Sequence, residues 1–129
     1  MDIKQTYSTD LDLEVNGVWV TTGDAKFLIA RMHNPDYNER LLAAMKPYKR
    51  QQLSKDESLK LMVAIEAETI LLDWDGVTEN GQPVPYSKEK AREYLMIKDF
   101  RAQVMEAATS MHTFKAEEVE EGEKNSQTP

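Results

Sequence analysis

Two carboxylates, one residue apart, are the side chains of this sequence best suited to chemistry. Asp73 and Asp75 lie in the stretch ILLDWDGVTENG (70–81), where a short apolar run leads into Asp-Trp-Asp-Gly. In phosphatases with an aspartate nucleophile, the first Asp attacks a phosphoryl group and the second acts as acid and base. Asp-x-Asp close to Asn80-Gly81 also bears a weak similarity to a calcium-binding loop. The alternatives are therefore an active site, a metal site or a turn without chemistry.

A phosphatase of the haloacid-dehalogenase type would need Asp73 at the carboxyl end of a central parallel strand. The residues before Asp73 instead continue a helical pattern, and the chain after it predicts two helices and no second strand. The sequence also lacks a paired acidic motif, following a suitable lysine, that would complete a magnesium site. A phosphohydrolase that uses Asp73 and Asp75 is therefore a remote alternative.

A calcium loop that begins at Asp73 would need an oxygen ligand at its fifth position, Gly at its sixth and Glu at its twelfth. Those positions hold Val77, Thr78 and Val84. We therefore expect Asp73 and Asp75 to be solvated at the end of a helix. Gly76 would let the chain leave that helix, and Trp74 would anchor the turn in the core.

The remaining polar residues offer no further reactive constellation. His33 and His112 are the only histidines and do not have the spacing of metal ligands. The chain has no cysteine, which excludes disulfides, zinc-thiolate sites and cysteine nucleophiles. Phosphate-binding glycine loops and hydrolase motifs are missing. We expect no enzymatic activity, no catalytic residue, no cofactor and no metal.

Length and charge limit the class of protein further. The 129 residues suit one domain with a real core, and the apolar runs are too short to span a bilayer. Met1-Asp2-Ile3-Lys4 does not open a signal peptide, so a cytosolic location is expected. The net charge of −7 argues against nucleic-acid binding.

That charge is unevenly distributed along the chain. Residues 40–60 carry six basic and two acidic side chains, whereas residues 61–87 carry five acidic and no basic ones. The simplest interpretation is solvated surface. The alternative is self-association between opposite patches, which would give oligomers that grow with concentration and weaken with salt.

The first thirty residues predict a small antiparallel meander at about residues 11–30. Leu11, Leu13 and Val15 alternate with acidic residues, and Asn16-Gly17 is a strong hairpin signal. Strands are expected over residues 18–20 and 26–30, with Gly23-Asp24 as the second turn. A sheet this small must pack one face on helices.

About four helices are predicted after the meander. Asn34-Pro35 starts the first, Ser54 and Glu57 form a capping box that opens a helix to about Leu72, and Ser87 caps the third. Asp99 is the expected cap of the last helix. The fold class is therefore mainly α with a small N-terminal antiparallel β-hairpin or meander.

The last helix carries an apolar seam, and an acidic tail follows it. The seam is spaced four, three, four and three residues and consists of Phe100, Val104, Ala107, Met111 and Phe114. It suits either the core or a contact with a partner or a second copy. We assign residues 1–116 to a single domain and residues 117–129 to a disordered tail.

Three passages over about residues 13–116 form a combined pattern in one order. They are Gly17-Val18-Trp19-Val20 with Gly23-Asp24-Ala25-Lys26-Phe27 and Ile29-Ala30-Arg31; Asn34-Pro35-x-Tyr37 with Leu41-Leu42 and Lys46-Pro47-Tyr48; and Trp74-Asp75-Gly76-Val77 with Asn80-Gly81-Gln82-Pro83-Val84-Pro85-Tyr86-Ser87, closing on Tyr94-Leu95 and Phe100. Together they resemble the tail assembly chaperones of long-tailed, siphovirus-like bacteriophages.

The resemblance implies structural anchors and a function. Trp74 would bury its indole, Pro85 would fix the exit of the loop and Ser87 would restart a helix, with Trp19 as a further anchor. Such chaperones bind the tape measure protein, work as oligomers in the host cytoplasm and are absent from the mature virion. A longer form, made by ribosomal frameshifting, recruits tail tube protein. The alternative is a small helical structural or adaptor protein of a phage tail.

Overall fold

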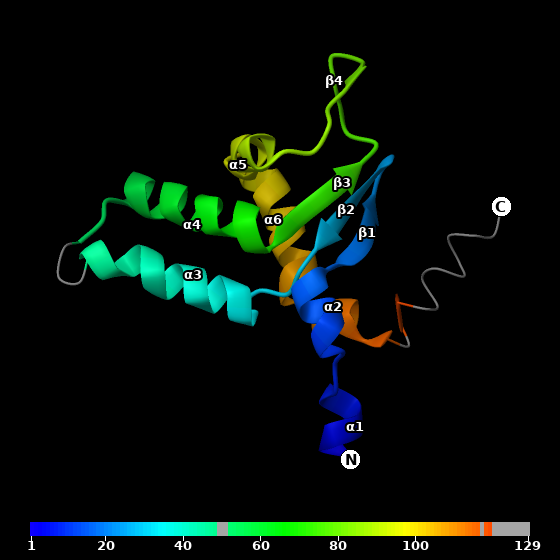
Figure 1. Cartoon of the computed structure of the whole chain (residues 1–129). Helices are drawn as coiled ribbons and strands as arrows, with labels where there is room; N and C mark the ends of the chain where they lie inside the picture. The colour runs from blue at the N-terminus through cyan, green and yellow to red at the C-terminus, as the bar shows by residue number, and fades with distance from the viewer. Residues whose placement is uncertain (49–51, 117, 120–129) are drawn as a thin grey trace.

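The computed structural model describes residues 1–48, 52–116 and 118–119. The expected fold class is confirmed: the chain is mostly helical, with a three-stranded antiparallel sheet in the order β1-β2-β3 and a separate small hairpin, β4–β5 (Figure 1). The elements are α1 (Ile3–Tyr7), α2 (Leu11–Asn16), β1 (Val18–Thr22), β2 (Ala25–Ile29), α3 (Pro35–Met45), η1 (Lys46–Tyr48), α4 (Lys55–Thr69), β3 (Leu71–Asp75), β4 (Thr78–Glu79), β5 (Gln82–Pro83), α5 (Lys88–Leu95), α6 (Lys98–Thr109) and η2 (Met111–Phe114).

The strand predicted over residues 11–15 is instead the short helix α2. Asp10 caps it, because its carboxylate accepts hydrogen bonds from the backbone N–H groups of Asp12 and Leu13 at 2.9 and 3.2 Å. Gly17 ends it with a φ of 90°, and its N–H donates to the carbonyl of Leu13. Asn16-Gly17 is therefore a helix end, and the predicted hairpin turn there is wrong.

The predicted turn at Gly23-Asp24 is confirmed and joins β1 to β2. The third strand of the sheet comes from much later in the chain. β3 pairs antiparallel with β2, and Phe27 lies opposite Trp74. Helix α4 therefore ends at Thr69, and the expected continuation to about Leu72 is wrong. The N–H of Ala30 donates to the carbonyl of Ile70 at 2.8 Å, which joins this segment to the sheet.

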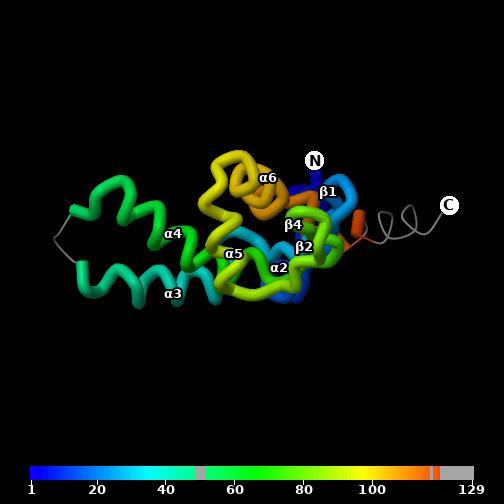
Figure 2. The backbone as a smooth tube through the Cα atoms, turned by 90° about the horizontal axis from the view of Figure 1, so that it is seen from above, coloured from blue at the N-terminus to red at the C-terminus, as the bar shows by residue number. Residues whose placement is uncertain are grey.

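Helices α3 and α4 form an antiparallel pair that extends away from the sheet, and both views show it (Figures 1 and 2). We call α3, η1 and α4 the helical arm. The predicted caps are confirmed: Asn34 accepts from the N–H of Tyr37, and Ser54 and Glu57 form a capping box. Ser87 likewise caps α5. These local signals determine where the arm begins and where the chain returns to the sheet, α5 and α6, which we call the body.

The core lies between the sheet, α4, α5 and α6. One sheet face, which we call the inner face, carries Phe27, Ile29 and Trp74 and packs against α6, where Phe27 and Phe100 have ring centroids 5.4 Å apart. The opposite side is called the outer face. None of the helices in the described part of the chain is long and apolar enough to cross a membrane.

The last long helix is shorter than the apolar seam predicted. Helix α6 ends at Thr109, Ser110 is extended, and the chain resumes as the short 3-10 helix η2. The seam therefore bends between Ala107 and Met111 instead of forming one continuous helical stripe. Asp99 does not cap α6 either, because the cap position is Ile97 and makes no side-chain hydrogen bond. Of the tail predicted over residues 117–129, only 118 and 119 are among the described residues.

Candidate functional site

The Asp-Trp-Asp stretch is a β-strand whose side chains alternate between the two sheet faces. Trp74 points into the core with 6% exposure, whereas Asp73 and Asp75 belong to the outer face. One Asp73 carboxylate oxygen accepts from the N–H of Trp74 at 2.8 Å, and Asp75 lies opposite Lys26 in the register. The expectation that both carboxylates sit at a helix end is therefore wrong, although Asp75 is exposed as expected.

The position of β3 bears on the two chemical alternatives. A phosphatase nucleophile would stand at the end of a central parallel strand, whereas β3 is antiparallel to β2 and lies at the margin of the sheet. Within residues 1–48, 52–116 and 118–119, no group of three His, Asp or Glu side chains is placed to hold a metal ion. The geometry of Asp73 and Asp75 thus gives no support to either site.

Trp74 is the centre of an aromatic cluster under the loop that follows β3. Its indole N–H donates to the carbonyl of Val84 at 2.8 Å, and its ring lies 4.9 Å from Tyr86 and 5.5 Å from Tyr94. The hydroxyl of Tyr86 donates to the carbonyl of Leu71 at 2.7 Å, and burial, assisted by Asp73, raises the pKa of Tyr86 to about 12. The loop is therefore fastened to the strand before it.

The other expected anchors occupy different environments. Pro85 is exposed and lies between the core residues Val84 and Tyr86, and Ser87 accepts from the N–H of Lys90 at 3.0 Å. Trp19 instead lies on the outer face of β1 with 48% exposure, because strand alternation turns Val18 inward. Trp19, expected as a structural anchor, therefore has a half-exposed indole at the surface of the single chain.

The residues of the seam lie mostly inside the chain. Val104 and Phe114 are 2% and 0% exposed, and the Arg31 guanidinium carbon is 6.0 Å from the Phe114 ring centroid. Phe100 and Met111 are half-buried. The structure thus brings these four residues against the body of the same chain. It does not gather them into one outward surface for a partner or a second copy.

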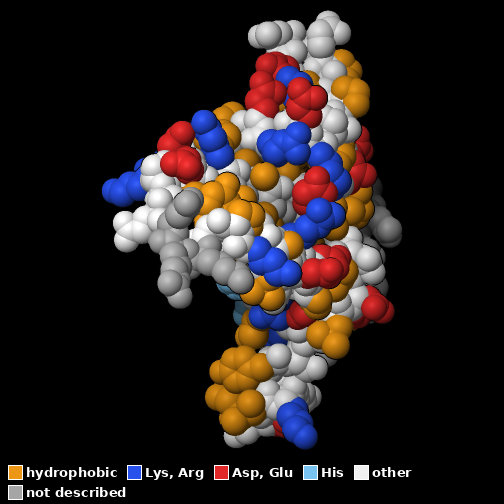
Figure 3. Space-filling view, turned by 60° about the vertical axis from the view of Figure 1, so that its left-hand side comes forward, with side chains coloured by type: hydrophobic (Ala, Val, Ile, Leu, Met, Phe, Trp, Pro, Cys, Tyr) orange, Lys and Arg blue, Asp and Glu red, His pale blue; other side chains and the backbone are white. Residues whose placement is uncertain are grey.

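An exposed apolar surface is found on the helical arm instead. Tyr37 is buried and Leu41 and Ala44 are half-buried, whereas Leu42 and Met45 are 71% and 41% exposed. Because Leu42 and Met45 are three residues apart, they lie on one face of α3. In Figure 3, which brings the arm forward, hydrophobic side chains lie beside Lys and Arg side chains. Leu42 and Met45 define what we call the arm face.

Sequence reasoning missed the arm face, although a signal was present. The adjacent Leu41 and Leu42 cannot both face the same neighbour, since successive helical residues are turned by about 100° from each other. Tyr37, Leu41 and Ala44 complete the inward row of α3, which leaves Met45 on the same side as Leu42. The exposed Leu42 was therefore recognisable as a candidate for binding.

Charged contacts hold the base of the arm to the body. Glu66, which is fully buried, accepts two hydrogen bonds from the guanidinium of Arg101, at 2.9 and 2.6 Å. This hydrogen bonding raises the pKa of Arg101, and burial raises the pKa of Tyr37. Lys88 also lies 3.8 Å from Glu68. The outer end of the arm has no comparable attachment to the body among the described residues.

Comparison with known proteins adds one family match. The model of the family described as YdaY prophage protein matches residues 32–125. That range contains the arm, β3, α5 and α6, and leaves out β1 and β2. Neither a curated protein nor a solved structure matches the chain.

Proposed function

The chain belongs to the YdaY prophage protein family, and we propose that it is a non-enzymatic tail assembly chaperone that binds the tape measure protein of its phage. The observation that carries this proposal is the arm face, where Leu42 and Met45 are exposed on a helix pair that projects from the body. The sequence resemblance to tail assembly chaperones of long-tailed phages supports the same function.

The arm suits a helical client for a geometric reason. Two packed helices bury only the sides that face each other, so half-buried apolar residues remain at the flanks. Leu59 and Met62 of α4 are such residues, as is Leu41 of α3. A client helix with its own apolar stripe can lie beside α3 and cover Leu42 and Met45. The tape measure protein, which the resemblance implies to be long and helical, offers many such stripes.

The sequence between α3 and α4 is basic and would orient a client. The sequence from residue 46 to 55 contains Lys46, Lys49, Arg50 and Lys55 and no acidic side chain. A basic segment of the sequence, in a chain of net charge −7, attracts acidic segments of a client and repels basic ones. Such steering affects the rate and register of binding more than its strength.

The proposal includes the wider setting that the resemblance implies. The chain works in the cytoplasm of the bacterial host, as a homo-oligomer, and leaves before the virion is complete. Tail tube protein is a second partner, recruited through a longer, frameshifted form of the same chain. The phage origin rests on the family match, whereas these partners rest on the resemblance.

Co-expression with the tape measure protein of the same prophage tests the function. We expect the chain to increase the soluble fraction of that protein, and Leu42→Asp to abolish most of the increase, because a carboxylate in the contact must lose its hydration. Ser58→Asp is the matched control, since Ser58 is an exposed residue of α4. An unchanged solubility of the tape measure protein with the wild-type chain would refute the proposal.

The competing function, an adaptor or structural protein of the tail, predicts a different result. An adaptor would remain in purified particles, whereas a chaperone would be absent from them. Mass spectrometry of virions produced by the induced prophage distinguishes these outcomes. The gene order gives an independent check, because a chaperone gene is expected between those for the tail tube and the tape measure proteins.

A further inference from the structure

Strand β1 is an edge strand with free hydrogen-bonding groups. Among residues 1–48, 52–116 and 118–119 it pairs only with β2, and the two-residue turn sets Thr22 opposite Ala25, Val20 opposite Phe27 and Val18 opposite Ile29. In an antiparallel ladder, alternate residues bond to the neighbour and the others point away from it. Pairs that flank a two-residue turn bond to each other. The N–H and C=O groups of Trp19 and Thr21 therefore point to the free edge.

The free edge is short and unprotected. Its residues, Val-Trp-Val-Thr-Thr, include no charge and no proline, and the β1–β2 register is regular. Natural edge strands usually carry a lysine, a proline or a bulge that prevents pairing with another strand. At one end Gly17 already donates its N–H to Leu13, and at the other the chain turns at Gly23. The available groups are thus those of Trp19 and Thr21.

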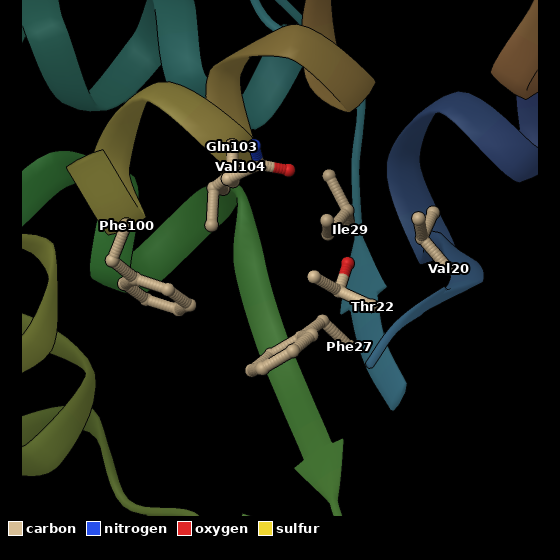
Figure 4. A pocket seen from close by; sticks show the side chains of 7 residues that line it. All are labelled: Val20, Thr22, Phe27, Ile29, Phe100, Gln103 and Val104. Carbon is tan, nitrogen blue, oxygen red and sulfur yellow. The ribbon is translucent and has the colours of Figure 1, made fainter. Parts of the chain in front are cut away.

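Both faces of the same strand carry uncovered apolar surface. On the inner face, Val20 and Thr22 form one side of an open pocket of about 130 Å³ (Figure 4). The rest of its lining consists of Phe27, Ile29, Phe100, Gln103 and Val104. On the outer face, Trp19 is 48% exposed. One neighbouring strand at this edge would cover the backbone groups, the mouth of the pocket and part of the indole together.

We propose that this neighbour is β1 of a second copy of the chain, paired antiparallel about a two-fold axis at Val20. In that register Trp19 of each copy lies opposite Thr21 of the other, so all the free N–H and C=O groups of both strands are bonded. Shifting the register by two residues in either direction pairs one of these residues with Gly17 or Gly23 and leaves bonds unmade. The two three-stranded sheets become one continuous sheet.

A second copy fits this edge better than an unrelated strand. A two-fold pair satisfies two identical edges at once, and it sets Val20 against Val20 beside both pockets. The contact contains no charged residue of β1. The main electrostatic term that opposes dimerisation is therefore the repulsion between two chains that each carry a net charge of −7. Raising the salt concentration should therefore preserve or strengthen the dimer. A contact between the basic and acidic stretches of the sequence would weaken instead.

Single-cysteine variants test the register directly, because the chain has no cysteine of its own. Directly opposite residues of a non-hydrogen-bonded pair have Cβ atoms about 4.5–5.5 Å apart, within reach of a disulfide after a small adjustment. Val20→Cys should therefore form a covalent dimer under mild oxidation. Trp19→Cys, whose two copies would lie diagonally at about 7–8 Å, should react several-fold more slowly. Equal rates, or a Val20→Cys chain that stays monomeric, would overturn the proposal.

Thr21→Pro tests the free edge without breaking the internal ladder. Proline removes only the outward N–H of Thr21, a position where edge strands tolerate it. Sedimentation velocity should show a concentration-dependent dimer for the wild type and for Thr21→Val, and at least a several-fold weaker dimer for Thr21→Pro. A wild type that is monomeric at every concentration, or a folded Thr21→Pro chain with unchanged dimerisation, would refute the edge contact. If Thr21→Pro does not fold, the comparison of Val20→Cys with Trp19→Cys still tests the proposed dimer.

Discussion

Arg101 of α6 and Glu66 of α4 form a two-point ion pair at the base of the helical arm, with hydrogen bonds of 2.9 and 2.6 Å. Glu66 is 0% exposed, whereas the Arg101 side chain is 31% exposed and partly hydrated. The pair therefore links a buried carboxylate to the surface. It also joins α4, one of the two long helices of the arm, to α6, which covers the inner face of the sheet.

Removing Arg101 should destabilise the protein strongly. In Arg101→Met the carboxylate of Glu66 remains buried without its partner, which costs about 3–5 kcal/mol for buried pairs. The partial exposure of Arg101 places the expected loss at the lower end of that range. Replacing both residues, as in Glu66→Met with Arg101→Met, should recover most of the loss, because no buried charge remains. Urea unfolding measures both variants, and a single variant as stable as the wild type would contradict the assignment.

The two tryptophans should respond differently to truncation. Trp74→Ala leaves a cavity in the core and removes the hydrogen bond to Val84, so the free energy of unfolding should fall by about 3–5 kcal/mol. Trp19→Ala removes a half-exposed side chain and should cost less than about 1 kcal/mol in the monomer. Thermal or urea unfolding at low protein concentration gives the comparison. Equal losses in the free energy of unfolding for the two variants would show that the indole of Trp19 is buried in solution.

The two carboxylates of the Asp-Trp-Asp stretch should contribute little to the stability of the fold. Replacing Asp73 and Asp75 together with Asn keeps the acceptor oxygen that bonds the N–H of Trp74 and removes the charges of one half-buried and one exposed carboxylate. The expected change in the free energy of unfolding is under about 1 kcal/mol. Purified wild-type protein should show no magnesium-dependent phosphatase activity. Activity that is present in the wild type and lost in this double variant would restore the enzymatic alternative.

Alkaline pH should loosen the loop after β3 through Tyr86. Its pKa lies at about 12 in the folded chain against 10.0 for an ordinary tyrosine, because burial disfavours the phenolate. The unfolded state therefore loses this proton first. Stability from Tyr86 is fully present below pH 10 and is lost as the pH rises towards 12. Tyr86→Phe, which cannot ionise, should show a weaker loss over that window, and ultraviolet absorbance of tyrosinate reports the titration.

The helix boundaries set by local contacts were predictable from the sequence alone. Asn34 caps α3, Ser54 and Glu57 cap α4, and Ser87 caps α5, each through a bond to a residue three positions away. Such bonds need no information from the rest of the chain. The turn at Gly23-Asp24 is equally local. The mainly helical fold class follows from these signals, since three of the four longest helices in the described part of the chain begin at them.

The strand–helix choices at Leu11 and Leu71 depended on distant contacts. Residues 11–15 alternate like a strand, yet the cap from Asp10 and the helix end at Gly17 make them helical. Leu71 continues the apolar pattern of α4, yet it lies opposite Ile29 and becomes part of the sheet. A strand is stable only beside a partner, and here the partner is more than forty residues away in sequence.

The binding surfaces were decided by tertiary structure for the same reason. Leu42 and Leu41 are identical in type, and only the packing of α3 on α4 exposes the first and half-buries the second. Trp19 and Trp74 likewise differ in burial because Trp19 points to the outer face of the sheet, whereas Trp74 points to the inner face and packs against Tyr86 and Tyr94. Sequence identifies residues able to bury apolar area, whereas the neighbours that the fold supplies determine which of them remain exposed.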